Sequence, residues 1–149
     1  MPATFDEYGV RFLYPDNWEI TERTAGDESV GVTLESPDGA FFSLNRYHRQ
    51  TDAESLKEQV IEAMRAEYDE IEVVPDPQSV RAEGEAGCEL NFFVLDLLVT
   101  ARILVIPDRH DLLLLQIQAE NRQFDKQERV FEAMLKTLRD HLQEADDPA

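Results

Sequence analysis

The sequence predicts an α+β domain in which helices cover a largely antiparallel sheet of about six or seven strands. Residues 88–119 contain the strongest apolar runs of the chain, separated by the polar segment 107–111, which is a strand, turn and strand pattern. Strands this apolar need cover on both faces, so we expect them in the middle of the sheet. The order along the chain, strands then helix then strands then helix, is typical of the α+β class.

Length and composition are those of one ordinary globular domain. A chain of 149 residues can bury roughly 68–70% of its unfolded surface without disulfides or metal. Hydrophobic residues make up 42% and charged residues 31% of the chain, which argues against general disorder. We therefore expect residues 1–149 to form a single domain.

The net charge is the unusual feature of the composition. The chain has 32 Asp and Glu against 14 Lys and Arg, a formal charge of −18. Such a charge repels phosphate backbones and anionic lipids, so a nucleic-acid partner is not expected. A basic protein partner, a cation, a high-salt environment or simple surface solvation would each fit it. Residues 52–89 hold 12 acidic and 3 basic side chains, so half of the excess lies in about a quarter of the chain.

Short strands are expected before the first helix, at residues 9–14, 18–23, 30–35 and 40–47. The first two lie around a tight turn at Pro15-Asp-Asn17, and Ser36-Pro-Asp-Gly39 is a hairpin turn. Trp18 follows the first turn, and we expect it to pack in the core and fix the N-terminal hairpin on the sheet. In the last of these strands Phe42 and Leu44 share one face.

A helix is predicted to begin at the capping box Thr51-Asp-Ala-Glu54. Apolar residues then recur every four positions on one face, at Leu56, Val60, Met64 and Tyr68. Carboxylates lie on the other faces, at Glu54, Glu58 and Glu62. These three glutamates are the candidate acidic binding surface.

Further strands are expected at residues 71–74 and 79–83, before the long apolar run from Cys88 to Ile106 and the run 112–119. A second capping box, Asp125-Lys-Gln-Glu128, predicts a helix over about 126–142. Residues 143–149 are expected to fray.

No catalytic, metal or cofactor site is predicted. A glycine-rich phosphate loop, a nucleophile elbow, a zinc-ligand pair and a dinucleotide fingerprint are all absent from the sequence. The turn Asp108-Arg-His-Asp111 could supply metal ligands, but Arg109 would repel a cation, so a solvated hairpin turn is favoured. Cys88, the single cysteine, heads an apolar strand and is expected to be buried and inert. We therefore expect no enzyme activity.

The sequence contains no secretory signal, and Asp96 and Arg102 interrupt the best candidate membrane span. As written, the chain is predicted to be cytoplasmic and not inserted in a membrane. A periplasmic or lipid-anchored protein whose signal was removed is the alternative.

The segment Gly9-Val-Arg-Phe-Leu-Tyr-Pro-Asp-Asn-Trp18 resembles the opening of PsbP-like and DcrB-like proteins. A central hairpin led by Gly87 and a closing helix with Phe131, Leu135 and Leu138 also resemble that superfamily. The resemblance implies an α-β-α sandwich, as in the extrinsic photosystem II subunit and the yeast Ran-binding Mog protein. It implies no common activity, because members are mostly non-enzymatic accessory or binding proteins. No functional motif of the family maps onto this chain.

These observations favour a soluble, non-catalytic bacterial accessory protein that docks a protein partner through a sheet face or through residues 52–89. One alternative is a chaperone whose exposed apolar sheet face receives helices of a client protein. The other is a module that binds a small ligand or cation in a pocket with converging polar groups. The sequence indicates neither the identity of a partner nor the oligomeric state.

Overall fold

The computed structural model describes residues 2–48, 51–75 and 84–146. Within these residues the chain forms the following elements in order: β1 (Pro2–Glu7), β2 (Val10–Pro15), β3 (Glu19–Ala25), β4 (Ser29–Glu35), β5 (Phe41–His48), α1 (Ala53–Glu67), β6 (Ile71–Pro75), β7 (Ala86–Val94), β8 (Leu97–Asp108), β9 (Asp111–Glu120) and α2 (Asn121–Asp146). The predicted strand at 79–83 lies outside the described residues.

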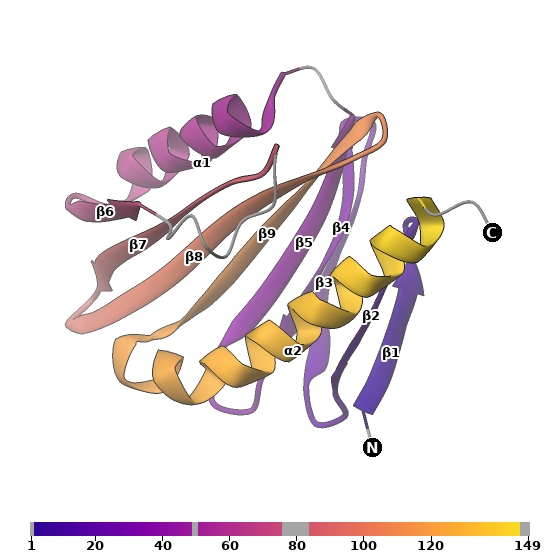
Figure 1. Ribbon diagram of the computed structural model, residues 1–149. Helices are drawn as coiled ribbons and strands as arrows, with labels where there is room; N and C mark the ends of the chain where they lie inside the picture. Colours follow the sequence, from indigo (N-terminus) through magenta and orange to yellow (C-terminus); the bar gives the residue numbers. More distant parts are fainter. Residues whose placement is uncertain (1, 49–50, 76–83, 147–149) are drawn as a thin grey trace.

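A seven-stranded antiparallel sheet in the order β3-β4-β5-β9-β8-β7-β6 is the centre of the fold. The apolar strands β8 and β9 lie in its interior, as their composition predicts, and strands β1 and β2 form a separate hairpin. Figure 1 shows α2 crossing one face of the sheet and α1 lying against the other. The predicted α+β class and α-β-α sandwich are therefore confirmed.

Two hydrophobic cores, one on each face, hold the layers together. On one face Phe42 and Leu44 lie beside Ile117 and Leu115 of β9, and α2 covers them with residues such as Phe131. On the other face the second core lies under α1 and is formed mainly by β7 and β8, with residues such as Leu90, Phe92 and Ile103 packed against Ile61. Burying one such side chain contributes about 1.5–3 kcal/mol, so each helix is fixed mainly by its apolar face.

Trp18 and Cys88 have the structural roles that the sequence predicts. Trp18 is buried, and its ring meets Phe131 of α2 edge-on with centroids 5.9 Å apart. Cys88 is buried in the core beneath α1. Both predictions of a packing role are confirmed.

The N-terminal pairing differs from the prediction. The segments on either side of the Pro15 turn do not pair with each other: β2 pairs with β1, and β3 pairs with β4. The strand β1 was not predicted, and its Phe5 stacks on Phe12 of β2 with centroids 5.1 Å apart. The amide of Trp18 donates to the carbonyl of Pro15 at 3.0 Å, where the chain passes from the small sheet to the large one.

The prediction of one continuous strand from Cys88 to Ile106 is wrong. This run folds back on itself as the hairpin β7–β8, with Val94 opposite Leu97 and the turn at Leu95 and Asp96. Asp96 is the only turn-favouring residue there, and without Gly, Pro or Asn beside it the turn signal within the apolar run is weak. The fold thus exposes part of a segment that the composition predicts to be buried.

Both helix starts also differ from the prediction. The cap of α1 is Asp52 rather than Thr51, since the Asp52 carboxylate accepts a hydrogen bond from the Ser55 amide at 2.8 Å. Helix α2 begins at Asn121, so Asp125 lies inside the helix and is not its cap. The early start places Phe124 in the core, which the predicted loop would not have done. Residues 143–146, predicted to fray, are still helical.

Candidate functional site

The three predicted glutamates form a stripe along the exposed face of α1. Glu54, Glu58 and Glu62 are four residues apart, and their side chains are 59%, 57% and 70% exposed. Lys57 Nζ lies 2.5 Å from Glu54 and 3.6 Å from Glu58, and Arg65 lies 3.2 Å from Glu62. The glutamate ends of these pairs are exposed, and surface pairs are typically worth about 0.2–1 kcal/mol, so the carboxylates remain accessible. We call these three residues the acidic stripe.

Beyond the end of α1, the surface forms an open hollow of about 890 Å³ that is lined by β6, β7, Arg65 of α1, Leu98 of β8 and Asn121 of α2. Its acidic lining residues are Asp69, Glu70, Glu72 and Glu89. Apolar walls come from Phe92, Phe93 and Leu98. We call Asp69, Glu70 and Glu72 the acidic rim, because all three are exposed at the edge of the hollow.

A polar network supports the wall of this hollow. Asn121, at the start of α2, donates to the Thr100 hydroxyl at 2.9 Å, and that hydroxyl donates to Asn91 at 2.8 Å. The Asn91 amide in turn donates to Glu72 and to Glu89, each at 3.3 Å. These bonds connect β6, β7, β8 and α2. Sequence reasoning missed the network because its members are distant along the chain.

Next to the hollow, the β7–β8 turn exposes a group of large apolar side chains. Phe93, Val94, Leu95 and Leu97 are 59%, 37%, 93% and 49% exposed. Phe93 also lines the hollow, so the apolar group and the acidic rim adjoin. We call these four residues the apolar tip. In Figure 1 the β7–β8 turn lies at the lower left, at the end of the sheet.

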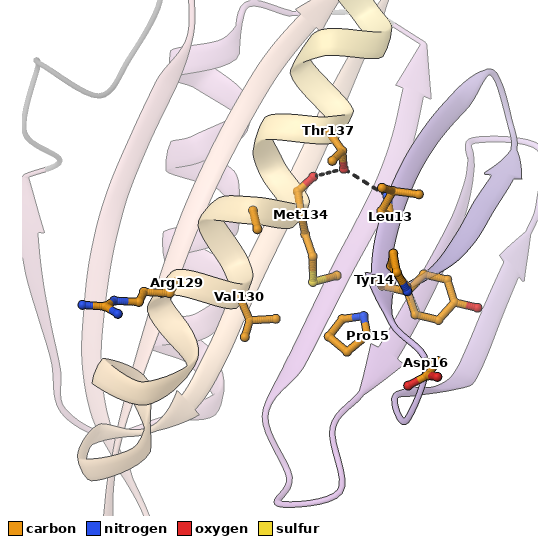
Figure 2. Close-up of a pocket in the computed structure, with 10 residues that line it drawn as sticks. Leu13, Tyr14, Pro15, Asp16, Arg129, Val130, Met134 and Thr137 are labelled. Atoms are coloured by element: carbon orange, nitrogen blue, oxygen red, sulfur yellow. Dashed lines mark hydrogen bonds between the residues drawn. The ribbon is translucent and has the colours of Figure 1, made fainter.

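An apolar groove of about 540 Å³ separates α2 from β2 (Figure 2). Leu13, Tyr14 and Pro15 lie on the β2 side, and Val130 and Met134 on the helix side. The hydroxyl of Thr137 accepts from the Leu13 amide at 3.0 Å and donates to the Met134 carbonyl at 2.8 Å, so it is already engaged.

The side chain of Arg129, which also borders this groove, extends away from β2 in Figure 2. A small-ligand site usually combines apolar walls with a few converging polar groups that orient the ligand. The groove has the walls, but neither Thr137 nor Arg129 supplies such a group, and Asp16 adds a single carboxylate at its edge rather than a converging set. The small-ligand alternative therefore gains no support here.

The turn between β8 and β9 is a hairpin turn, as predicted, but its carboxylates are not solvated. Asp108 is buried, and Arg46 binds Asp108 at 2.8 Å and Asp111 at 2.9 Å. Arg46 also donates to the carbonyls of Tyr8 and Gly9, at 2.8 and 3.4 Å. The guanidinium thus ties the β1–β2 turn to the end of the large sheet.

Arg46 also fixes the ionisation of this site. Burial opposes ionisation of Asp111, but hydrogen bonds from Arg46 and His48 outweigh it and lower the pKa of Asp111 below its ordinary value. A cation placed between the two carboxylates would compete with the guanidinium. In the described part of the chain, no group of three or more acidic, His or Cys residues is arranged to hold a metal ion.

The face of the sheet that α1 leaves uncovered is mostly polar, with the half-buried Phe41 as an apolar exception. Over β4, β5 and β9 it presents half-buried Thr33, Ser43, Asn45, Gln116 and Gln118. The Thr33 and Ser43 hydroxyls are 3.2 Å apart, and the two glutamine amides are 3.0 Å apart. A chaperone that receives client helices on its sheet needs an apolar face, so this surface does not favour the chaperone alternative.

Neither helix in the described residues is long and apolar enough to cross a membrane. Helix α2 has 26 residues, but charged side chains are spread along its length.

No protein-family model matches the sequence, and no curated protein matches it either. Solved structures do match the fold. The cyanobacterial PsbP (CyanoP) from Synechocystis sp. PCC 6803 is 14% identical, with a TM-score of 0.60 over 91% of this chain and 90% of that one. The Ran-binding protein Mog1p of Saccharomyces cerevisiae is 9% identical, with a TM-score of 0.61 over 92% of this chain and 94% of that one.

Likeness at such low identity shows the fold alone. The α-β-α sandwich implied by the opening motif Gly9–Trp18 is confirmed by the match over nearly the whole length of each chain. The chain has the fold shared by PsbP and Mog1p.

Proposed function

We propose that this protein is a non-catalytic binding module that docks a basic surface of a protein partner through the acidic stripe on α1. The observation that supports this most is the position of Glu54, Glu58 and Glu62. They point into solvent on successive turns of a helix whose opposite face is fixed to the sheet. Lys57 and Arg65 compensate part of their charge, and the remaining excess of carboxylates on a rigid helix suits electrostatic recognition of a basic surface.

Surrounding charge extends the same surface. The acidic rim follows α1 directly in the chain and lies at its C-terminal end. The protein has an excess of 18 negative charges in total. Nucleic acids and anionic membranes would be repelled, whereas a Lys-rich or Arg-rich protein surface would be attracted.

The fold comparison agrees with this proposal by analogy only. One protein with the same fold, Mog1p, is described as Ran-binding, so the fold can present a surface for a protein partner. We carry over neither that partner nor its site. The proposal includes no cofactor, no metal and no reaction.

Charge reversal tests the proposal. The triple variant Glu54→Lys, Glu58→Lys, Glu62→Lys should weaken partner binding by on the order of tenfold or more, because like charges then face each other. The matched control is Glu19→Lys, Glu22→Lys, Glu28→Lys, three exposed glutamates on or next to β3, which forms the opposite edge of the sheet from β6.

Both variants change the net charge equally, so only the position of the charge differs between them. We expect the stripe variant to lose the partner and the β3 variant to keep it. Equal losses would indicate a non-specific effect of net charge. No loss in the stripe variant would remove α1 as the docking surface.

A further inference from the structure

We propose that the apolar tip is the anchor of the docking surface, and that it inserts into an apolar pocket with a basic rim on a protein partner. The tip is Phe93, Val94, Leu95 and Leu97, next to the acidic rim Asp69, Glu70 and Glu72. This inference rests on the proposed function and adds to it an apolar contact beside the electrostatic one. A few buried aromatic and aliphatic residues typically dominate the energy of an interface.

Folding does not explain the exposure of the tip. Leu95 is 93% exposed, and Phe93 and Leu97 each leave about half of their surface in water. Scattered exposed apolar residues are ordinary, but several large ones gathered at one turn mark an interaction site. The core packing of β7 and β8 comes from buried residues away from the turn, so polar residues at the turn would have cost little core packing.

The backbone at Leu95 is a second, independent observation. Its φ is +57°, in the left-handed region that Gly or Asn occupies at little cost and that a leucine side chain disfavours. A two-residue turn with Asn or Gly there would be better for folding. Leu95 is therefore unfavourable for the free protein in both conformation and exposure, which fits a role in binding.

The tip is presented on a rigid support. The pairing of β7 with β8 continues to the turn, with Phe93 opposite Leu98 and Val94 opposite Leu97. Behind it, the Asn121 to Asn91 network fixes the strands to the start of α2. A preorganised anchor loses little conformational entropy on binding, which favours affinity.

Charge selects the class of partner. Asp96 lies in the turn itself, and the acidic rim borders the hollow that Phe93 lines. An anionic membrane would repel these carboxylates, and any bilayer would have to desolvate them. A second copy of the chain would bring another net charge of −18. A protein pocket that is apolar inside and rimmed by Lys or Arg satisfies both the apolar and the acidic parts.

The test uses the full-length protein with a photo-reactive benzophenone amino acid in place of Leu95, irradiated in lysate of its own host. The side chain is apolar, so it keeps the anchor. The matched control carries the same group in place of His110, an exposed residue in the turn at the opposite end of β8. Cross-linked peptides are identified by mass spectrometry. We expect one protein to be captured from position 95, not from 110, at an apolar segment flanked by Lys or Arg.

Two substitutions separate the anchor from folding. Leu95→Asn should weaken binding of the captured partner at least about tenfold, whereas Leu95→Met, which keeps an apolar side chain, should bind within about threefold of wild type. Both variants should fold, because Leu95 contributes almost no buried surface. Binding to a membrane is measured with vesicles of phosphatidylcholine alone and with phosphatidylserine. Self-association is measured by sedimentation.

The possible results are distinct. A partner that binds wild type and Leu95→Asn equally would overturn the anchor and leave the proposed function intact. Failure of the wild-type protein to bind any partner would overturn both. Vesicle binding that Leu95→Asn abolishes, or a cross-link from position 95 to a second copy, would also overturn the inference, because the tip would then have a different occupant.

Discussion

Replacing Leu95 by Asn should make the protein more stable, although the residue belongs to an apolar run. Leu95 has a φ of +57° and is 93% exposed. The left-handed conformation costs a leucine about 1 kcal/mol, and Asn tolerates it, so the replacement should raise the free energy of unfolding by about that amount. Full burial of a leucine is worth about 2 kcal/mol, so the small buried remainder of Leu95 contributes only about 0.2 kcal/mol. The expected net gain is therefore roughly 0.5–1 kcal/mol.

Urea denaturation measures this gain directly. The midpoint for Leu95→Asn should rise while the slope stays unchanged, since the surface exposed on unfolding is almost the same. The melting temperature should rise by about 1–4 °C for a chain of this size. The matched control is Leu97→Asn, at a strand position of the same hairpin whose φ is not positive and whose side chain is half-buried. The free energy of unfolding of Leu97→Asn should fall by about 1 kcal/mol.

A neutral or destabilising Leu95→Asn would refute this reasoning. It would mean that Leu95 packs against the protein or that its backbone conformation is not strained. The argument that the tip is unfavourable for folding would then fail, even if binding were lost.

Three further outcomes follow from the Arg46 site and the sheet. Arg46→Met should lower the free energy of unfolding by about 3 kcal/mol, because it leaves the buried Asp108 carboxylate without its cation. The melting temperature should fall by roughly 6–12 °C. An unchanged melting temperature would contradict the role of Arg46. The lowered pKa of Asp111 means that its contribution to stability is complete at neutral pH and is lost as the pH falls below about 4. Urea denaturation at neutral pH and at about pH 3 should therefore show a smaller acid-induced loss in Asp111→Asn than in wild type, and equal losses would count against the pKa shift. Gly31→Ala should destabilise by about 1–3 kcal/mol, because the new methyl carbon would lie only 2.6 Å from the Leu44 carbonyl oxygen; a stable alanine variant would show that the strands can separate there.

The layers of the fold could be predicted because they follow from periodicity. Continuous apolar runs predicted the interior strands β8 and β9, and the spacing of Leu56, Val60 and Met64 predicted the buried face of α1. These signals are local in the sequence, since each strand or helix contains its own pattern. The opening motif at residues 9–18 added the α-β-α arrangement.

The turns and caps could not be predicted where the local chemistry was ambiguous. Asp96 favours a turn, but Leu95 beside it continues an apolar run, so the pairing of β7 with β8 decides the turn. Thr51 and Asp52 are both good caps, and the helix begins after the second. Asp125 also resembles a cap, but the helix starts earlier, at Asn121, and so places Phe124 in the core.

The surface arrangement was only partly predictable. The acidic stripe follows from helical spacing, and the structure brings its three members onto one exposed face as expected. The apolar tip was missed because an apolar run indicates burial unless its turn is recognised. The Arg46 cluster was missed because Arg46 is more than 60 positions from both Asp108 and Asp111, and a single sequence does not reveal such a pairing.

Purification of the tagged protein from its own host at low and at high salt tests the central claim most directly. The claim is that an acidic surface docks a basic protein partner. The Debye length falls from about 8 Å at physiological ionic strength to about 3 Å at about 1 M salt, so a complex held by attraction between charges should weaken at high salt. We expect one specific partner to co-purify at low salt and to be lost or strongly reduced at high salt. A partner retained equally at both salt concentrations, or no partner at either, would contradict the account.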